Sequence, residues 1–519
     1  MEKEFNITGK CIPSRHYMAD VSNKLERAIQ LIEKGEYFII NRPRQYGKTT
    51  MLFGLETLLN DMGEYLVFNT SFEGISETTF DDGRTLANGF VRLLLRSRSY
   101  YPPDGVSALL AAAPPLSSLD ALSAFITDFT SKTDKRVVVL IDEVDQSSNN
   151  ELFVLFLAML RNKYLVRDKV KTFHAVVLAG VHDVKSLKLK LRPNEEQKYN
   201  SPWNIAAEFK VDMNLQPAEI KPMLAEYCAD RSVKMNTRKI ADRLFYFTSG
   251  YPFLVSKICK MLDEADVPLK KSRKWTTEDI DAAAQALITQ TNTNFESLIK
   301  NLEHNTALYE SVYNIAVDAE TRSFNPHNPA TNLGVLYGIF ADRKGLVIHN
   351  RIYREIIVDY MTDKMQQTQI SHGADYGGGF KNADKSINME AVLTKFQAFM
   401  REQYSRKDRA FLERNGRLVF LAFIKPIING SGYDFKEPQV SDERRLDVII
   451  TYLQHRYLAE LKIWRGQAAH EEGLSQLADY LDRLALTVGY LIIFDHAKIK
   501  SWKSEWVTVN EKKVFAIWV

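Results

Sequence analysis

The stretch NRPRQYGKTTML, residues 41–52, decides the fold of the first part of the chain. It lies between a short apolar run and an apolar-periodic segment, so it predicts a loop that joins a buried strand to a helix. It matches the pattern G-x-x-x-x-G-K-[ST] at Gly47, Lys48 and Thr49, whereas Arg42 stands at the first glycine position. A strand, a loop and a helix in this order are the setting that the pattern requires.

The loop carries residue types that bind phosphate groups. Backbone N–H groups at a helix N-terminus wrap phosphate oxygens, and Gly47 lets the backbone approach them closely. Lys48 would reach the β- and γ-phosphates of a nucleotide, and the Thr49 hydroxyl would bind Mg²⁺. Taken alone, the loop could equally be a basic turn that precedes a helix.

A second apolar run ends in two acidic residues. VVVLIDEVD, residues 137–145, predicts a buried strand that is followed by Asp142 and Glu143. We predict that Asp142 holds the Mg²⁺ shell and that Glu143 orients the attacking water. The alternative is that Asp142 only caps the next helix, but the phosphate loop upstream disfavours it.

Further apolar runs complete a predicted α/β fold. YFII (37–40), VVVLI and AVVLAG (175–180) alternate with helical segments, among them an amphipathic helix over 21–34. This alternation indicates a parallel sheet covered by helices on both faces. After the third strand, His182 or Asp183 could sense a γ-phosphate, or each could belong to a surface turn.

The length of 519 residues predicts more than one domain. Beyond the sheet, the stretch GVLYGIFADRKGLVIHNRIY (334–353) predicts a helix, a hairpin and a helix, as in a winged-helix domain. A polar, Gly-rich stretch that follows predicts a flexible linker, after which a new α/β pattern begins. The predicted parts are a core over 1–215, a helical lid with the winged-helix-like domain over 216–368, the linker over 369–389 and an α/β domain over 390–519.

Composition excludes several classes of protein. With 45% hydrophobic residues, 26% charged residues and a net charge of +3, the chain is expected to be globular, without a bulk charge that attracts nucleic acid. Cys11, Cys228 and Cys259 lie far apart and lack histidines at metal spacing, so no zinc site or disulfide framework is indicated. No apolar run approaches the roughly 18 residues of a membrane span, and the start MEKEFNITGK lacks the apolar core that is expected of a signal peptide. We therefore expect a cytoplasmic protein with no membrane partner.

A second candidate site lies in RRLDVIITYLQHRYLAELKIWRG, residues 444–466. LDVIITY and YLAELKI predict two strands of a hairpin joined by LQHR, with Glu460 and Lys462 on one face because they are two residues apart. The expected register sets Glu460 opposite Ile449, so Asp447 lies one diagonal step away. Two carboxylates and the Leu461 carbonyl would suit Mg²⁺ or Mn²⁺, and Lys462 would activate water. The alternative is an ordinary solvated strand.

The first site resembles those of bacterial AAA-like ATPases allied to the signal-transducing (STAND) NTPases and archaeal ATPases. The resemblance rests on HYM (16–18), GEYFIINRPRQYGKTTML (35–52), VVVLIDEVD and SGYPFLVSKIC (249–259), and it covers residues 1 to about 365. The missing first glycine is typical of that group. The resemblance implies ATP binding, slow hydrolysis and a homo-oligomer. The implied ATP contacts are Arg44, Gln45, Tyr46, Gly47, Lys48, Thr49, Thr50 and Asp142.

The second site resembles the PD-(D/E)XK nuclease superfamily over about 390–519. The resemblance rests on RRLDVII, YLAELKIW and GLSQLADYL, although Leu446 stands where a proline is usual. It implies metal ligands at Asp447 and Glu460 and a catalytic lysine at Lys462. It also implies accessory roles for Glu413, Gln476 and Tyr480.

The two resemblances together predict an ATP-regulated nuclease. Its expected cofactors are ATP and Mg²⁺ or Mn²⁺, and its expected substrate is nucleic acid, DNA in preference to RNA. Bacterial defence against mobile DNA is the setting that such fusions imply. The alternative is an ATP-dependent switch or scaffold whose C-terminal domain binds nucleic acid or a partner without cutting.

Overall fold

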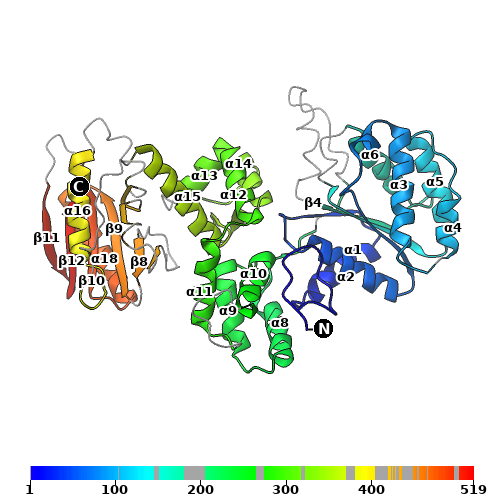
Figure 1. Cartoon of the computed structure of the whole chain (residues 1–519). Helices are drawn as coiled ribbons and strands as arrows, with labels where there is room; N and C mark the ends of the chain where they lie inside the picture. The colour runs from blue at the N-terminus through cyan, green and yellow to red at the C-terminus, as the bar shows by residue number, and fades with distance from the viewer. Residues whose placement is uncertain are drawn as a thin grey trace. The chain divides into compact units, whose positions relative to one another are not determined.

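The chain forms two compact units in a computed structural model (Figure 1). The first unit comprises Met1–Leu298 and Asn332–Ile339, and the second comprises Ile299–Thr331 and Phe340–Val519. The structure describes residues 2–102, 104–144, 151–180, 205–207, 209–264, 274–316, 322–369, 380, 382–403, 416, 419–421, 423–424, 427, 432–434, 448–452, 455–464, 466–495 and 502–519.

The first unit contains a four-stranded parallel sheet with the strand order β1-β4-β3-β2. Its strands are β1 (Phe38–Asn41), β2 (Tyr65–Ser71), β3 (Arg136–Asp142) and β4 (Ala175–Gly180). The three predicted strands are confirmed, whereas β2 was not predicted. The predicted helix over 21–34 is α1, and Leu25 on its apolar face is only half-buried.

Helices lie on both faces of this sheet, as its apolar strands require. Alternate residues of β3, among them Val139 and Ile141, pack with Phe90, Ile126 and Phe156 of three helices that gather on one face (Figure 1). The other face carries the phosphate-loop helix. The elements are α1 (Ser22–Glu33), α2 (Lys48–Asp61), η1 (Glu77–Phe80), α3 (Gly83–Arg98), α4 (Gly105–Ala111), α5 (Leu119–Ser131) and α6 (Glu151–Leu165).

A helical segment follows the sheet in the same unit. It comprises α8 (Pro217–Asp230), α9 (Thr237–Thr248), α10 (Pro252–Asp263), α11 (Thr277–Ile288) and the start of α12 (Thr293–Glu303). The N-terminal segment is packed against it, because the rings of Phe5, Tyr17, Tyr227 and Trp275 form one cluster. Thr276 caps α11 through a reciprocal bond pair with Asp279.

The predicted helix, hairpin and helix over 334–353 are present. They are α14 (Pro329–Leu336), the antiparallel pair β5 (Phe340–Asp342) and β6 (Leu346–Ile348), and α15 (Arg351–Gln369). In the second unit, α13 (Thr306–Ala316) contacts both β6 and α15. Whether this part is a winged-helix domain stays a prediction.

The second unit also contains a six-stranded mixed sheet with the strand order β11-β12-β10-β9-β8-β7. Leu458, Leu491 and Ala516 from three of its strands pack against Leu477 and Leu481 of α18. The elements are α16 (Met389–Gln403), β7 (Gly432–Asp434), β8 (Val448–Tyr452), β9 (His455–Ile463), α18 (Gln467–Arg483), β10 (Val488–Phe494), β11 (Ser504–Val509) and β12 (Lys512–Trp518).

The predicted hairpin is present, but the predicted register differs by two residues from the observed one. Ile449 faces Leu458, not Glu460, and Tyr452 faces His455. The connection is therefore two residues long rather than the four of LQHR, because β9 begins at His455. Two-residue loops are the commonest hairpin connections, since their twist matches that of the strands.

Candidate functional site

The phosphate-loop sequence forms the turn between β1 and α2. Gly47 is the N-cap residue of α2 and has φ 76°, in the left-handed region that favours glycine. Arg42, at the position of the missing first glycine, donates from its guanidinium to the carbonyl oxygens of Asn41 (2.7 Å) and Val211 (2.5 Å). Burial lowers the pKa of Arg42. A half-buried arginine side chain therefore fixes the entry of the loop where most such loops use a glycine.

Lys48, Thr49 and Asp142 come together at the start of α2. The Lys48 ammonium is buried and donates to the carbonyl oxygens of Arg42 (3.1 Å) and Pro43 (2.9 Å). The Thr49 hydroxyl donates to Asp142 Oδ2 at 2.5 Å, and Asp142 is 5% exposed. Asp142, the last residue of β3, thus places its carboxylate beside the first turn of α2, where the phosphate loop ends.

The remaining predicted nucleotide residues differ in their contacts. Arg44 and Gln45 are exposed, and Gln45 has φ 58°. Tyr46 is buried and its hydroxyl donates to Asn214 Oδ1 at 2.6 Å, while Thr50 accepts a bond from the Cys11 N–H at 3.0 Å. Glu143 follows β3 with φ 52° and donates its N–H to Asp142 Oδ1 at 2.9 Å.

Two residues that the sequence did not single out hold the loop from the helical segment. The Tyr251 hydroxyl, at the start of α10, donates to the Arg44 carbonyl at 2.7 Å. The Asn294 amide, in the first turn of α12, donates to Gln45 Oε1 at 2.9 Å. A buried tyrosine between Gly250 and Pro252 was a possible signal for the first contact. Nothing local marks Asn294.

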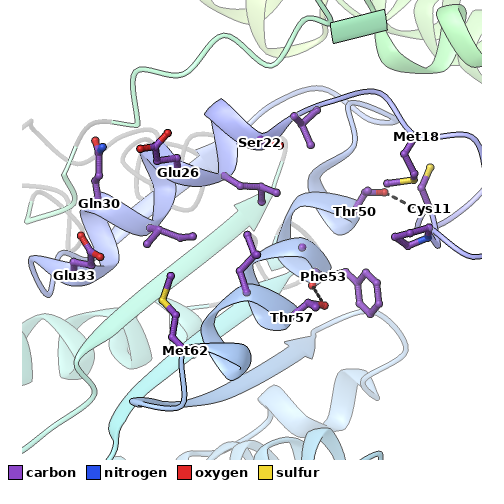
Figure 2. Close-up of a pocket in the computed structure, with 16 residues that line it drawn as sticks. Cys11, Met18, Ser22, Glu26, Gln30, Glu33, Thr50, Phe53, Thr57 and Met62 are labelled. Carbon is purple, nitrogen blue, oxygen red and sulfur yellow. Dashed lines mark hydrogen bonds between the residues drawn. The ribbon is translucent and has the colours of Figure 1, made fainter. Parts of the chain in front are cut away.

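A pocket of about 580 Å³ adjoins the loop at Thr50. Figure 2 shows Thr50, Cys11 and Met18 at one end and Gln30 and Glu33 of α1 at the other. Between them the lining is mostly apolar and includes Leu25, Ile29, Phe53, Leu58 and Met62. A few polar groups in a mostly apolar pocket of this volume are typical of small-molecule sites.

The second candidate site lies on β9 and α18. Glu460 is 2% exposed, and its Oε1 lies 2.8 Å from the Lys462 ammonium on the same face of the strand. Lys462 also donates to Gln476 Oε1 at 3.3 Å, and Gly473 of the same helix leaves room beside the lysine stem. The predicted partners Glu460, Lys462 and Gln476 are therefore in contact.

Other predicted nuclease residues are placed differently or lie outside the described residues. Tyr480 packs in the apolar core beneath the helix, and Leu461 is half-buried on β9. Asp447 and Glu413 lie outside the described residues, as do His182 and Asp183. Among the residues that the structure describes, no group of three or more His, Cys, Asp or Glu side chains could hold a metal ion.

Comparison with known proteins gives only distant likenesses. No protein-family model matches the sequence, and no curated protein matches it. A Walker-type ATPase from Pyrococcus abyssi is similar in structure, with 10% identity, a TM-score of 0.45, and coverage of 68% of this chain and 99% of the other. ORC2 from Aeropyrum pernix is 14% identical, with a TM-score of 0.37 and coverage of 70% of this chain and 97% of the other. A RuvB mutant from Thermotoga maritima is 12% identical, with a TM-score of 0.34 and coverage of 65% of this chain and 94% of the other. At these scores the likenesses assign no family and no function.

Across the described residues, no helix has the length and apolar character needed to span a membrane.

Proposed function

We propose that the chain is an ATP-binding and ATP-hydrolysing protein that controls a metal-dependent nuclease site in its own C-terminal part. The observation that carries the nucleotide half is the contact of Thr49 with Asp142 beside the buried Lys48. The nuclease half is supported by the buried Glu460 carboxylate next to the Lys462 ammonium.

The residues at the first site suit a nucleotide and Mg²⁺. The Lys48 ammonium is held by loop carbonyl oxygens, which phosphate oxygens can replace as acceptors. A hydroxyl and a carboxylate side by side are hard oxygen ligands of the kind that Mg²⁺ prefers. Bound Mg²⁺ would neutralise negative charge on the phosphates. Glu143, next to Asp142, would orient the attacking water.

The base and ribose of the nucleotide are proposed to occupy the pocket beside Thr50 (Figure 2). Its apolar lining suits a purine ring, and the carboxylate of Glu26 at its rim can accept from an exocyclic amine. Leu25→Trp would narrow this pocket between α1 and α2, since Leu25 lines it and lies against Gly54 of α2. We expect it to weaken ATP binding without weakening the binding of inorganic triphosphate.

At the second site, Glu460 and Lys462 are proposed to act on a phosphodiester. The Glu460 carboxylate would hold Mg²⁺ or Mn²⁺, and the Lys462 ammonium would activate water or stabilise charge on the phosphorus centre. Asp447, proposed as the second carboxylate, directly precedes Val448, whose cross-strand partner Ala459 directly precedes Glu460. Gln476 keeps Lys462 in position from α18.

The test is cleavage of plasmid, single-stranded DNA and RNA in Mg²⁺ or Mn²⁺, with Glu460→Gln beside the wild-type protein. The matched control is Glu505→Gln, because Lys503 and Glu505 form an exposed ion pair, also two residues apart, at an edge of the same sheet. We expect Glu460→Gln to abolish cutting and Glu505→Gln to retain it.

The substrates in this test also decide which nucleic acid the site acts on, and we expect DNA to be cut in preference to RNA. A homo-oligomer and a bacterial defence setting complete the proposal. If wild-type protein hydrolyses ATP and binds nucleic acid but cuts none of the substrates, the nuclease proposal fails and the non-cutting switch replaces it.

A further inference from the structure

We propose that α12 carries the nucleotide state of the phosphate loop to α15 through Asn294 at its first turn and Glu303 at its last residue. The inference rests on the proposed function, because it names how the nucleotide site would regulate the second unit. It is carried by contacts at both ends of one continuous helix, Thr293–Glu303.

The N-terminal end of α12 contacts the phosphate loop. Asn294 is 8% exposed, and its amide donates to Gln45 Oε1 at 2.9 Å and lies 3.4 Å from the Tyr251 hydroxyl. Tyr251 in turn donates to the Arg44 carbonyl at 2.7 Å, and its ring packs edge-on to Tyr46 at 4.5 Å. One small polar cluster therefore holds the backbone and side chain of neighbouring loop residues.

The loop conformation that this cluster holds is one that phosphate binding would disturb. Gln45 adopts φ 58°, which costs a residue with a side chain on the order of 1 kcal/mol. Lys48 is bonded to the carbonyl oxygens of Arg42 and Pro43, within the same loop. Phosphate oxygens compete for this ammonium, and its release from Arg42 and Pro43 would loosen the loop directly before Arg44 and Gln45, to which Tyr251 and Asn294 are bonded.

The other end of the helix contacts α15. Glu303 accepts hydrogen bonds from the Tyr360 hydroxyl and from the Lys364 ammonium, the latter at 2.8 Å. Tyr360 and Lys364 are four residues apart, so both lie on one face of α15. The Lys364 ammonium lowers the pKa of Glu303, so the carboxylate is ionised at neutral pH.

The helix between these ends is shared by the two units. Its residues up to Leu298 belong to the first unit, and those from Ile299 belong to the second. The nine steps from Asn294 to Glu303 span about 13 Å of helix at roughly 1.5 Å per residue. Displacement of Asn294 is proposed to pass along this helix to Glu303. In the sequence, α15 leads on to the segment that carries Glu460.

The test is hydrogen exchange of the full-length protein with and without ATP and Mg²⁺, read at peptides from α15. We expect ATP to change the exchange of α15 at least several-fold in the wild-type protein and in the control Asp128→Asn, whose exposed ion pair with Lys132 lies on α5. In Glu303→Gln we expect ATP to bind with unchanged Kd and the change at α15 to be lost. Tyr360→Phe should reduce that change.

The outcomes separate this inference from the proposed function. If ATP binds and α15 exchange does not change, or changes equally in Glu303→Gln, the coupling through α12 is overturned. If α15 responds as expected and no nucleic acid is cut, the coupling stands and the nuclease proposal fails. If ATP does not bind at all, the nucleotide proposal and the coupling fail together.

Discussion

Replacement of Gly250 by alanine tests how tightly the helical segment supports the phosphate loop. Gly250 has φ 77°, and a Cβ atom there would lie 2.2 Å from the Leu215 carbonyl oxygen. The left-handed conformation alone costs alanine about 1 kcal/mol. Relief of the backbone overlap adds about 1–3 kcal/mol, because Leu215 also donates its N–H to the Gly250 carbonyl at 2.7 Å and cannot move independently.

Gly63→Ala is the matched control for this variant. Gly63 has φ 75°, but a Cβ atom there meets nothing within 4 Å, so only the conformational cost applies. We expect Gly250→Ala to lower the free energy of opening of α10 peptides by roughly 2–4 kcal/mol in hydrogen exchange and to weaken ATP binding. We expect Gly63→Ala to lower that of its own region by about 1 kcal/mol. Equal losses in the two variants would refute this explanation.

Three further predictions concern charge and hydrogen bonding. Thr49→Val should weaken ATP binding in the presence of Mg²⁺ by about tenfold, or about 1.4 kcal/mol, because the hydroxyl ligand of Mg²⁺ is lost, whereas Thr49→Ser should bind as the wild-type protein does. Measurement of the Kd for ATP with and without EDTA checks this. Glu460→Gln should change the free energy of unfolding by no more than about 1 kcal/mol, since its partner Lys462 is 36% exposed. Lys24→Met breaks the ion pair with Glu219, whose side chains are 6% and 15% exposed, and should lower the free energy of unfolding by about 3 kcal/mol or more. Chemical unfolding measures both. Burial lowers the pKa of His16, so its contribution to stability is present above about pH 6.5 and is lost as the pH falls toward the folded-state value. The protection factors of residues 2–18, corrected for the intrinsic pH dependence of amide exchange, should therefore fall between pH 7 and pH 5.5, and unchanged protection factors would contradict this.

The sequence predicted those parts of the fold that local patterns determine. Apolar runs located β1, β3 and β4. β2 was not predicted, because its apolar residues are followed directly by the polar Asn69 and Thr70. Its burial depends on pairing with β3, which no local pattern reveals.

The candidate sites show the same limit. The spacing of Glu460 and Lys462 fixed their shared face, because side chains alternate along a strand. The register between β8 and β9 depends on the length of the loop that joins them, so the assumption of a four-residue loop shifted the predicted register by two residues. The bond from Arg42 to Val211 and the contacts of Tyr251 and Asn294 with the loop join residues about 169 to 249 positions apart, so no spacing in the sequence could predict them.

The most direct test of the central claim is the initial rate of nucleic-acid cleavage as a function of ATP concentration, set beside the Kd for ATP measured by equilibrium binding. We predict that the rate changes with ATP and is half-changed near that Kd in the wild-type protein. In Lys48→Ala it should stay at its nucleotide-free value over the same range. A wild-type protein that binds ATP and cuts at one rate at every ATP concentration would contradict control of the nuclease site by the nucleotide site.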